Sequence, residues 1–279
     1  MTHQVIKITK QKSWLPKKLI DVFYPWTLAF GFDPFRTKRA LRGLLITFRE
    51  YQRIKSQNAL LGKKYEIKFS YPVFSDRYEP AGIASGHYFH QDLLVAQKIY
   101  QSNPTRHVDV ASRVDGFVAH VASFRSIEVF DIRQISSKVP NITFRQYDLT
   151  KPQNEYIDYC DSLSCLHALE HFGLGRYGDP IDIGGHVKGF ENLRQILKVG
   201  GIMYLSVPIG PERIDFNAHR AFAIATILSM AENDFKLLDF SFVDDAGELH
   251  RDIPLTQAAI ECQCGCIYGC GIFEFQKVS

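Results

Sequence analysis

The sequence lacks any long apolar run of the kind that forms a membrane-spanning helix or a signal peptide. Its opening, MTHQVIKITKQKSW, has no apolar core, and the most apolar early stretch, residues 19–35, is too short to span a bilayer and is interrupted by Asp, Pro and Gly. We therefore expect a cytoplasmic protein. Aromatic side chains beside Lys and Arg in this stretch fit contact with a membrane surface, and they equally fit a helix packed on a neighbouring domain.

A recognised zinc-binding pattern is also missing. Four of the six cysteines crowd into the segment CQCGCIYGC (Cys262, Cys264, Cys266 and Cys270). Zinc ligands are usually paired two to four residues apart in two separate clusters. Reduced thiols or small buried apolar groups are therefore the expectation. We predict no metal site, and the sequence leaves open whether these four cysteines bind one.

The chain carries little net charge, +3 in total, but the charge is unevenly distributed. Residues 1–70 hold 15 Lys and Arg against 4 Asp and Glu, a net +11, which leaves −8 for the remainder. This asymmetry indicates a basic surface that either is simply solvated or faces an anionic partner: a substrate phosphate, a membrane surface or the acidic part of the chain. No nucleic-acid-reading module is recognisable, so nucleic-acid binding is not expected.

What is present is enough apolar sequence for a full core, 46% of 279 residues. From residue 86 onward, short β-like runs alternate with helical patterns, which predicts a mostly parallel sheet covered by helices on both faces. The expected strands lie within residues 106–112, 126–132, 141–149, 159–166, 201–208, 235–245 and 269–278, and the clearest expected helices are 189–201 and about 219–232. The last two strands have no helical pattern between them, so we expect seven strands with the last, near 272–276, antiparallel.

The N-terminal 85 residues are expected to form a basic, aromatic-rich and largely helical extension, and residues 86–279 a separate α/β domain. Residues 36–62 have helical spacing, with Gly62 as the expected C-cap. A boundary is indicated by the segment EPAGIASG, residues 79–86.

Polar residues at the ends of the expected strands point to a ligand site. In an open α/β sheet, ligands bind beyond the carboxyl ends of the strands, where the strand order reverses. Asp109 lies in the first strand, before a turn at residues 112–116. Asp131 ends the second strand, where a carboxylate can accept both hydroxyls of a ribose, and Asp148 follows the third strand, where such folds contact the base.

Several segments resemble class I S-adenosylmethionine (SAM) dependent methyltransferases: FRQYDL, CDSLSCLHALEHF, FENLRQILKVGGIMYLSVP and the terminal pair of strands. From about residue 86 to 277 the chain more closely resembles an uncharacterised branch of that superfamily, a domain of unknown function associated with surface-polysaccharide gene clusters. GHYFHQDLLVA, SRVDGFVAHVASFR, EHFGLGRYGDP and FNAHR carry this second resemblance. The resemblance implies a Rossmann-like fold, SAM as cofactor and methyl transfer to a carbohydrate or other small-molecule acceptor.

The cofactor-binding residues that the resemblance implies are Asp109, Ala111, Ser112, Arg113, Asp115, Gly116, Asp131, Ile132, Asp148 and Leu149. The superfamily places three glycines at alternate positions after the first acid, and here Ala111, Arg113 and Asp115 stand instead. Side chains at the last two positions occupy space that the cofactor would need, and glycine's backbone freedom is lost. Gly116 permits a displaced turn. Either SAM binds in an altered pose, or Arg113 recognises a carboxylate or phosphate.

Methyl transfer requires alignment of the acceptor with the methyl group, and an alcohol acceptor must also lose its proton. His167 and His171 are candidate bases because imidazole titrates near physiological pH, and Glu170 completes the catalytic set; the alternative is that these residues cap and pack a helix. Candidate substrate contacts are His87, His90, Arg176, Tyr177, His219 and Arg220. Structural alternatives stand for these as well: a capped surface turn around Arg176 and an internal salt bridge for Arg220.

The favoured function is therefore O-methylation of a carbohydrate or carbohydrate-linked acceptor by SAM. Two alternatives stay open. A non-catalytic binding or scaffolding protein that has kept the fold is supported by the missing glycines. An enzyme that uses another nucleotide or a sugar nucleotide is supported by the combination of Asp131 and Arg113.

Overall fold

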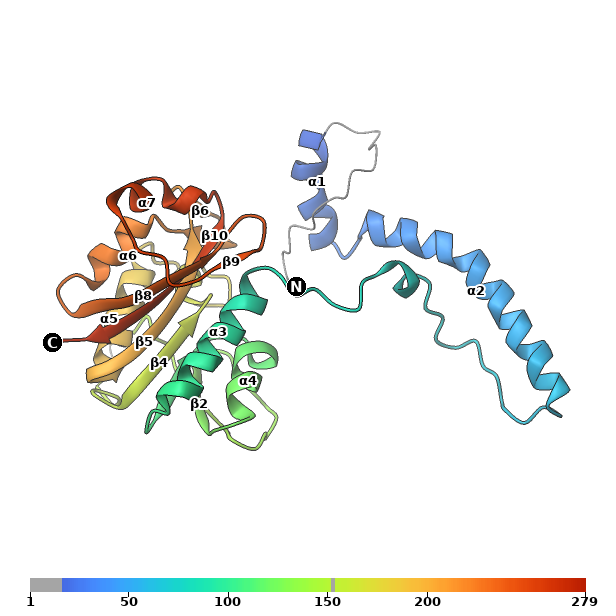
Figure 1. Ribbon diagram of the computed structural model, residues 1–279, viewed down its shortest axis with the longest axis horizontal. Coiled ribbons are helices and arrows are strands. Elements are labelled where there is room, and N and C mark those ends of the chain that lie inside the picture. Colours follow the sequence, from blue (N-terminus) through green and yellow to red (C-terminus); the bar gives the residue numbers. More distant parts are fainter. Residues whose placement is uncertain (1–16, 152–153) are drawn as a thin grey trace. The chain divides into compact units, whose positions relative to one another are not determined.

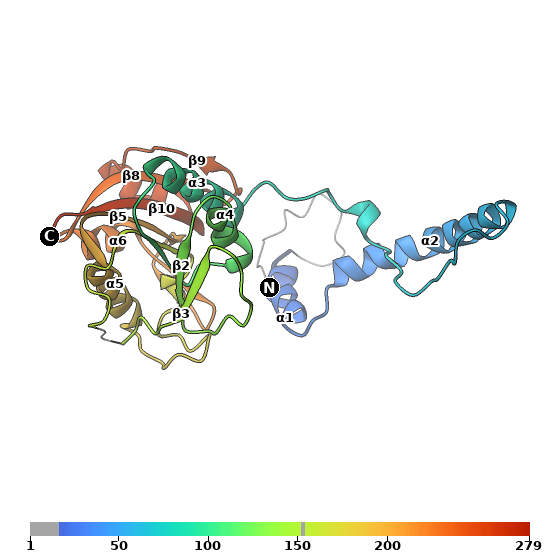
Figure 2. The ribbon, with the colours of Figure 1, turned by 90° about the horizontal axis from the view of Figure 1, so that it is seen from below.

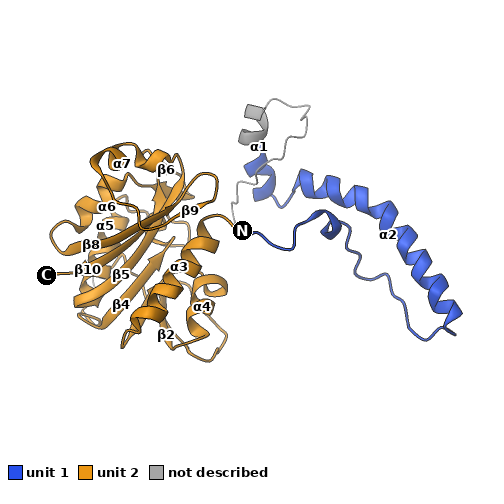
Figure 3. Ribbon diagram, viewed as in Figure 1, with its two compact units in different colours: residues 1–83 blue, residues 84–279 orange. Residues whose placement is uncertain are grey.

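The computed structural model describes residues 17–151 and 154–279, and the chain divides into two compact units, residues 1–83 and 84–279 (Figure 3). The first unit contains helix α1 (Lys17–Ala29), helix α2 (Pro34–Leu60) and a short 3-10 turn (Asp76–Tyr78). Helix α2 begins at Asp33, whose carboxylate accepts from the backbone N–H groups of the next turn, and Pro34 occupies the first helical position. The helix predicted over residues 36–62 is confirmed, and Gly62 follows it in a left-handed conformation, φ 69°.

Among the described residues, no helix has both the length and the apolar character needed to cross a membrane. Helix α2 does not bury an apolar face, because several of its large apolar side chains are exposed, including Leu41, Leu45 and Phe48. Gly43 is its one buried residue, since the backbone of Phe74 lies against it. Contact with a membrane surface and a cytoplasmic location stay predictions.

The second unit is built on one twisted sheet (Figure 1). In the described part of the chain this sheet has eight strands, in the order β3-β2-β1-β4-β5-β10-β8-β9. The strands are β1 (His107–Val110), β2 (Ile127–Asp131), β3 (Ile142–Gln146), β4 (Cys160–Leu166), β5 (Leu197–Ile209), β8 (Phe235–Val243), β9 (Leu249–His250) and β10 (Gly269–Lys277). Strands β1 to β5 pair in parallel, and the order reverses between β1 and β4.

Strand β10 is antiparallel to both of its neighbours, β5 and β8. This confirms the mostly parallel sheet with an antiparallel last strand. The seven expected strands are all present, and β9 adds a two-residue edge strand that pairs with the end of β8. No sequence pattern indicates this strand, because residues 245–256 are polar and the pairing is only two residues long.

Helices cover both faces of the sheet, as expected (Figure 2). Helix α3 (His87–Ser102), a π-helical turn (Val114–Val118) and α4 (Ala119–Ala122) pack on one side. Helices α5 (Gly185–Ile196) and α6 (Ile224–Ala231) pack on the opposite face. The short helix α7 (Gln257–Glu261) contacts the same layer through Ile260. The buried apolar residues accordingly form two clusters, one on each face.

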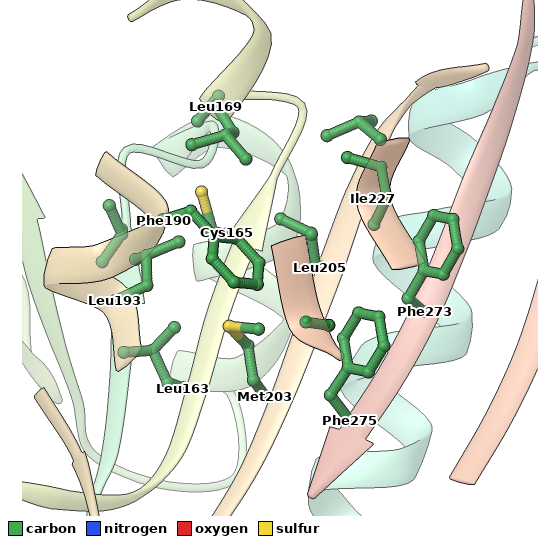
Figure 4. Packing of buried hydrophobic residues seen from close by; sticks show 14 of the residues in the cluster. Leu163, Cys165, Leu169, Phe190, Leu193, Met203, Leu205, Ile227, Phe273 and Phe275 are labelled. Atoms are coloured by element: carbon green, nitrogen blue, oxygen red, sulfur yellow. The ribbon is translucent and has the colours of Figure 1, made fainter. Parts of the chain in front are cut away.

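The larger cluster illustrates why the strands stay in place (Figure 4). Phe190 and Leu193 of α5 pack against side chains of β4 and β5, while Phe273 and Phe275 of β10 lie near Ile227 of α6. Each of these side chains is almost completely buried. Burial of one such side chain contributes roughly 1.5–3 kcal/mol, so this layer supplies much of the stability of the unit.

The helix predicted from about His219 to Glu232 is wrong at its start. Strands β6 (Arg213–Asp215) and β7 (His219–Ala221) form a separate hairpin, and α6 begins only at Ile224. The physical reason is local pairing: the backbone N–H of Phe222 donates to Pro208 O, and that of Gly210 donates to Phe222 O. These bonds hold the chain extended beside the end of β5. Helix α5 also begins earlier than expected, at Gly185 rather than Gly189.

Candidate functional site

The turn after β1 is closed by Asp109, which is completely buried. Its carboxylate accepts from the backbone N–H of Ser112 (3.1 Å), from the Ser112 hydroxyl (2.6 Å) and from the Ser164 hydroxyl on β4 (2.6 Å). Burial raises the pKa of Asp109 to about 7, although these hydrogen bonds favour the charged form. In this structure the first acid of the motif is used to shape the turn.

Ala111 in this turn has a left-handed backbone conformation, which glycine adopts more easily than alanine. Its φ is 57°, a left-handed value that costs a residue with a Cβ about 1–2 kcal/mol. Its N–H donates to Phe130 O on β2 at 2.8 Å, which fixes the turn against the neighbouring strand. The alanine therefore preserves the backbone path.

Arg113 and Asp115 pair with each other at the exposed side of the turn. Two parallel bonds join them, Nε to Oδ1 at 3.1 Å and a terminal guanidinium nitrogen to Oδ2 at 2.8 Å. The Arg113 guanidinium carbon also lies 5.4 Å from the centre of the Tyr88 ring. Both side chains are substantially exposed, so they are free to exchange this pair for a ligand. Gly116 is needed next to them, because a Cβ there would lie 2.6 Å from the Asp92 carboxylate.

Asp131, at the end of β2, is buried and already has a partner. Arg133 binds it in a bidentate way, with Nε 3.0 Å from Oδ1 and a terminal nitrogen 2.7 Å from Oδ2, and the Arg133 backbone N–H also donates to Oδ1 at 2.8 Å. The Arg133 guanidinium carbon stacks 4.3 Å from the centre of the Tyr177 ring. Ile132 lies between them in sequence and is half-buried. A ribose at Asp131 would therefore have to displace the guanidinium.

Asp148 lies after the end of β3. Its Oδ1 accepts from the backbone N–H and the hydroxyl of Thr150 at 3.0 and 2.6 Å, and its Oδ2 lies 3.1 Å from the Lys151 ammonium. Leu149 is buried in the core cluster, and its carbonyl accepts from Asn192 on α5. This segment is thus anchored to the sheet and to α5 at the edge where a base would lie.

His167 leaves the end of β4 in a left-handed conformation, φ 50°. Its Nδ1 lies 2.7 Å from Glu170 Oε1, and its Nε2 lies 3.1 Å from Nδ1 of His87, the first residue of α3. Burial lowers the pKa values of His167 and His87 to about 3, so both rings are neutral at physiological pH. Burial also raises the pKa of Glu170, whose Oε2 has no hydrogen-bond partner among the described residues.

His171 has a different arrangement. Its Nδ1 lies 2.7 Å from Ala218 O, which therefore accepts its proton, and its Nε2 lies 3.7 Å from Glu170 Oε1. Burial lowers the pKa of His171 below its usual value. Arg176 donates to the same Ala218 carbonyl at 2.6 Å, and the Tyr177 ring packs edge-on against His171. Of the two histidines, only His171 keeps a ring nitrogen without a hydrogen-bond partner.

Arg220 is buried under the loop that follows His171. Its guanidinium donates to the backbone carbonyls of Glu170 (3.3 Å), Phe172 (2.6 Å) and Ile183 (3.1 Å). The side chain therefore holds this loop through backbone carbonyls, and it forms no salt bridge with a carboxylate of the residues that the structure describes. A direct contact with substrate stays a sequence-based prediction that these bonds do not favour.

Replacement of Arg220 with Met is expected to destabilise the protein by about 2–3 kcal/mol, because buried carbonyls lose their donors. Urea unfolding followed by circular dichroism measures the change. Arg251→Met is the control, since Arg251 is exposed and is expected to change stability by less than about 0.5 kcal/mol. Equal stability of the two variants would show that the carbonyl contacts do not matter.

The remaining predicted substrate residues lie in two places. His219 is in the β6–β7 hairpin, with Nε2 3.3 Å from Asp215 and Nδ1 3.5 Å from the Tyr268 hydroxyl. His90 lies on α3, one turn after His87, and its buried Nε2 has no partner among the described residues. His87 and His219 thus both contact Tyr268, since the Tyr268 ring centre lies 5.5 Å from that of His87 and 4.8 Å from that of His219. His167 stacks on His87, with ring centres 5.1 Å apart.

The sequence-based reasoning missed Arg133, Tyr88, Tyr268 and Cys270 as neighbours of the site. Arg133 carried a weak signal, because it follows Asp131 by two residues and side chains two apart at the end of a strand share a face. Tyr88 comes from α3, Tyr268 from the residue before β10 and Cys270 from β10, and their sequence positions give no indication that they meet the end of β4.

Comparisons with known proteins give a family model and several solved structures. A family model described as "Caenorhabditis protein of unknown function, DUF268" matches residues 126–263, and no curated protein matches the sequence. Among solved structures, the N-methyltransferase NodS of Bradyrhizobium japonicum in complex with S-adenosyl-l-homocysteine is 10% identical, with 70% of this chain and 89% of that chain covered and a TM-score of 0.46.

Two further solved structures are similar at the level of the fold. The [4+2]-cyclase SpnF is 14% identical, with 72% and 90% coverage of the two chains and a TM-score of 0.49. A putative sarcosine dimethylglycine methyltransferase from Galdieria sulphuraria is 14% identical, with 68% and 86% coverage and a TM-score of 0.46. At these identities the similarity concerns the fold alone.

Proposed function

We propose that residues 84–279 form a SAM-dependent methyltransferase that acts on an oxygen of a carbohydrate or carbohydrate-linked acceptor. The observation that carries the proposal is the alignment of three features at adjoining strand ends: the left-handed turn at Ala111 after β1, the buried Asp131 at the end of β2, and Asp148 after β3. This is where an open α/β sheet binds a nucleoside. The acceptor class rests on the resemblance to the branch associated with surface polysaccharides.

The residues at these strand ends fit the cofactor if two ion pairs separate, Asp131 with Arg133 and Arg113 with Asp115. Asp131 would accept the ribose hydroxyls once Arg133, whose side chain is half exposed, turns toward solvent. Arg113 would leave Asp115 to bind the carboxylate of the methionine moiety, for which its planar guanidinium is suited. When bound, SAM supplies an activated methyl group on a sulfonium.

His171 is the residue that we assign as general base. Both ring nitrogens of His167 face protein groups, whereas Nε2 of His171 has no hydrogen bond to the described residues, with Glu170 Oε1 at 3.7 Å. Nε2 of His171 would accept the proton of the acceptor hydroxyl when the methyl group is transferred from SAM. Ala218 O holds the other ring nitrogen and so fixes the orientation of the ring.

Binding of SAM, measured by calorimetry, tests the proposal. Asp131→Ala is expected to weaken binding by about 1.5–3 kcal/mol, the value of a lost hydrogen bond to a charged group. Arg133→Gln is the informative companion, because removal of the competing guanidinium is expected to tighten binding. SAM affinity that is unchanged in Asp131→Ala, in a folded protein, would remove this carboxylate from the site.

The closed Asp131–Arg133 pair specifically favours one alternative, a binding or scaffolding protein that has kept the fold without the cofactor. Thermal unfolding in the presence of SAM, S-adenosylhomocysteine and several sugar nucleotides separates the two, because a ligand that binds only the folded state raises the midpoint. A shift with SAM supports the enzyme. No shift at millimolar SAM, together with recovered binding in the Arg113→Gly, Asp115→Gly double variant, would support the alternative.

A further inference from the structure

Three side chains that are far apart in the sequence meet behind the end of β4. His87 Nδ1, His167 Nε2 and Cys270 Sγ all lie within 4.8 Å of one another, and they come from the start of α3, the end of β4 and strand β10. The two nitrogens are 3.1 Å apart. Cys270 is completely buried and His167 nearly so. Among the described residues, this is where His and Cys side chains converge in the manner of a metal site.

Hydrogen bonds determine which nitrogen of His167 is available. A carboxylate lies 2.7 Å from Nδ1, so Nδ1 carries the proton and Nε2 directs its lone pair toward His87 and Cys270. In metal sites, the ligating histidines are usually oriented in this way, by a carboxylate or carbonyl on the other ring nitrogen. The backbone of Tyr268 accepts a hydrogen bond from the His87 ring, which restrains that ring as well.

We propose that His87, His167 and Cys270 bind a zinc-type divalent cation, with a fourth position left for a water molecule or an acceptor oxygen. Two imidazoles and a thiolate are a ligand set that selects zinc over magnesium or calcium. In a tetrahedral zinc site the ligand atoms lie roughly 3.3–3.6 Å apart, given bond lengths of about 2.0–2.3 Å. The observed spacings reach that geometry with side-chain shifts of about 1 Å. On binding, the Cys270 thiol loses its proton to solvent.

The surroundings favour an added positive charge. Glu170 is almost completely buried next to His167, and its Oε2 has no hydrogen-bond partner among the described residues. A buried carboxylate in that state is costly unless positive charge lies nearby. Arg176 acts on Glu170 in this sense, and a dication held by His87, His167 and Cys270 would add to it. From the sequence we predict no metal site: a pair of His87 and His90 with His167 or His171 is conceivable but not favoured, and nothing in the sequence adds Cys270 to it.

The proposed metal site does not depend on methyl transfer, and the experiment that tests it measures metal binding directly. The full-length protein, freed of metal with a chelator, is titrated with Co²⁺ and then with Zn²⁺. We expect one Co²⁺ per chain, with the intense d–d bands of a tetrahedral site and a sulfur-to-cobalt charge-transfer band, both abolished by stoichiometric Zn²⁺. SAM binding measured on the same metal-free sample reports on the proposed cofactor site separately.

Matched variants assign the ligands. Cys270→Ser is expected to lose the charge-transfer band, whereas Cys266→Ser, which alters another buried thiol of the same segment, is expected to keep it. His87→Ala is expected to lower the Co²⁺ affinity at least 100-fold; because His87 is only half-buried, this variant also serves if Cys270→Ser does not fold. A wild-type protein that retains no metal after dialysis, or a charge-transfer band that survives in Cys270→Ser, would overturn the proposal.

Discussion

Gly173→Ala is expected to destabilise the protein by about 2–5 kcal/mol. Gly173 has φ 78°, where a Cβ is strained, and an added methyl would lie 1.9 Å from the backbone carbonyl oxygen of Asp182. The strain costs about 1–2 kcal/mol and the forced displacement a further 1–3 kcal/mol. The displacement breaks contacts that hold the loop: Asp182 N–H donates to Gly173 O at 2.9 Å, and Gly173 N–H donates to Asp179 Oδ2 at 2.8 Å.

The same loop offers a matched control for Gly173→Ala. Gly178 has φ 84°, but a Cβ there meets nothing within 4 Å. Gly178→Ala is therefore expected to cost only the left-handed strain, about 1–2 kcal/mol. Urea unfolding of both variants measures the difference. If the two glycines prove equally tolerant, the close approach of residues 173 and 182 is not a constraint on the folded state.

His171→Asn is expected to lower the methyl-transfer rate about 10²–10⁴-fold, the usual contribution of a general base. Asparagine is the informative replacement, because its amide nitrogen takes the place of Nδ1 and still donates to Ala218 O, while Nε2 is lost. The affinity for SAM should be unchanged, since His171 is not one of the residues to which we assign cofactor binding. The rate is followed as formation of S-adenosylhomocysteine with a panel of carbohydrate acceptors. A full rate in a folded His171→Asn protein would contradict the assignment.

The dependence of the rate on pH gives a second test of His171. A base must be unprotonated to accept a proton, and burial lowers the pKa of His171 below its usual value. The acidic limb of the rate profile should therefore lie below pH about 6.5, the ordinary pKa of histidine. The limb should disappear from the residual rate of His171→Asn.

The long strands of the sheet could be predicted from the sequence because each has a local pattern of apolar residues. Buried parallel strands are rich in apolar residues, and IEVF in β2 and LSCL in β4 are short runs that are apolar at three of four positions. The hairpin of β6 and β7 was not readable, since its strands are three residues long and are set by bonds to Pro208 and Phe222 rather than by their own side-chain pattern. The helical spacing of residues 224–231 continues into residues 219–223, so the sequence predicts a helix that begins too early.

The candidate site was partly readable for the same reason. Asp131 and Asp148 follow strands, so their place at the carboxyl edge could be inferred from local sequence. What each carboxylate binds could not, because a side chain such as Arg133 can point toward the strand end or into solvent with no change in the pattern. The meeting of His87, His167 and Cys270 depends on how α3 and β10 pack around β4, and spacing along the chain does not encode that.

The central place of β10 has a consequence for how the chain is made. Strand β10 hydrogen-bonds to β5 on one side and β8 on the other, so the sheet is discontinuous until residues 269–277 have emerged from the ribosome. Until then β5 is an open edge, rich in apolar residues, to which another strand can add. The nascent domain is thus exposed to aggregation for the whole time needed to synthesise residues 210–277, and it is in this interval that a chaperone would be most useful.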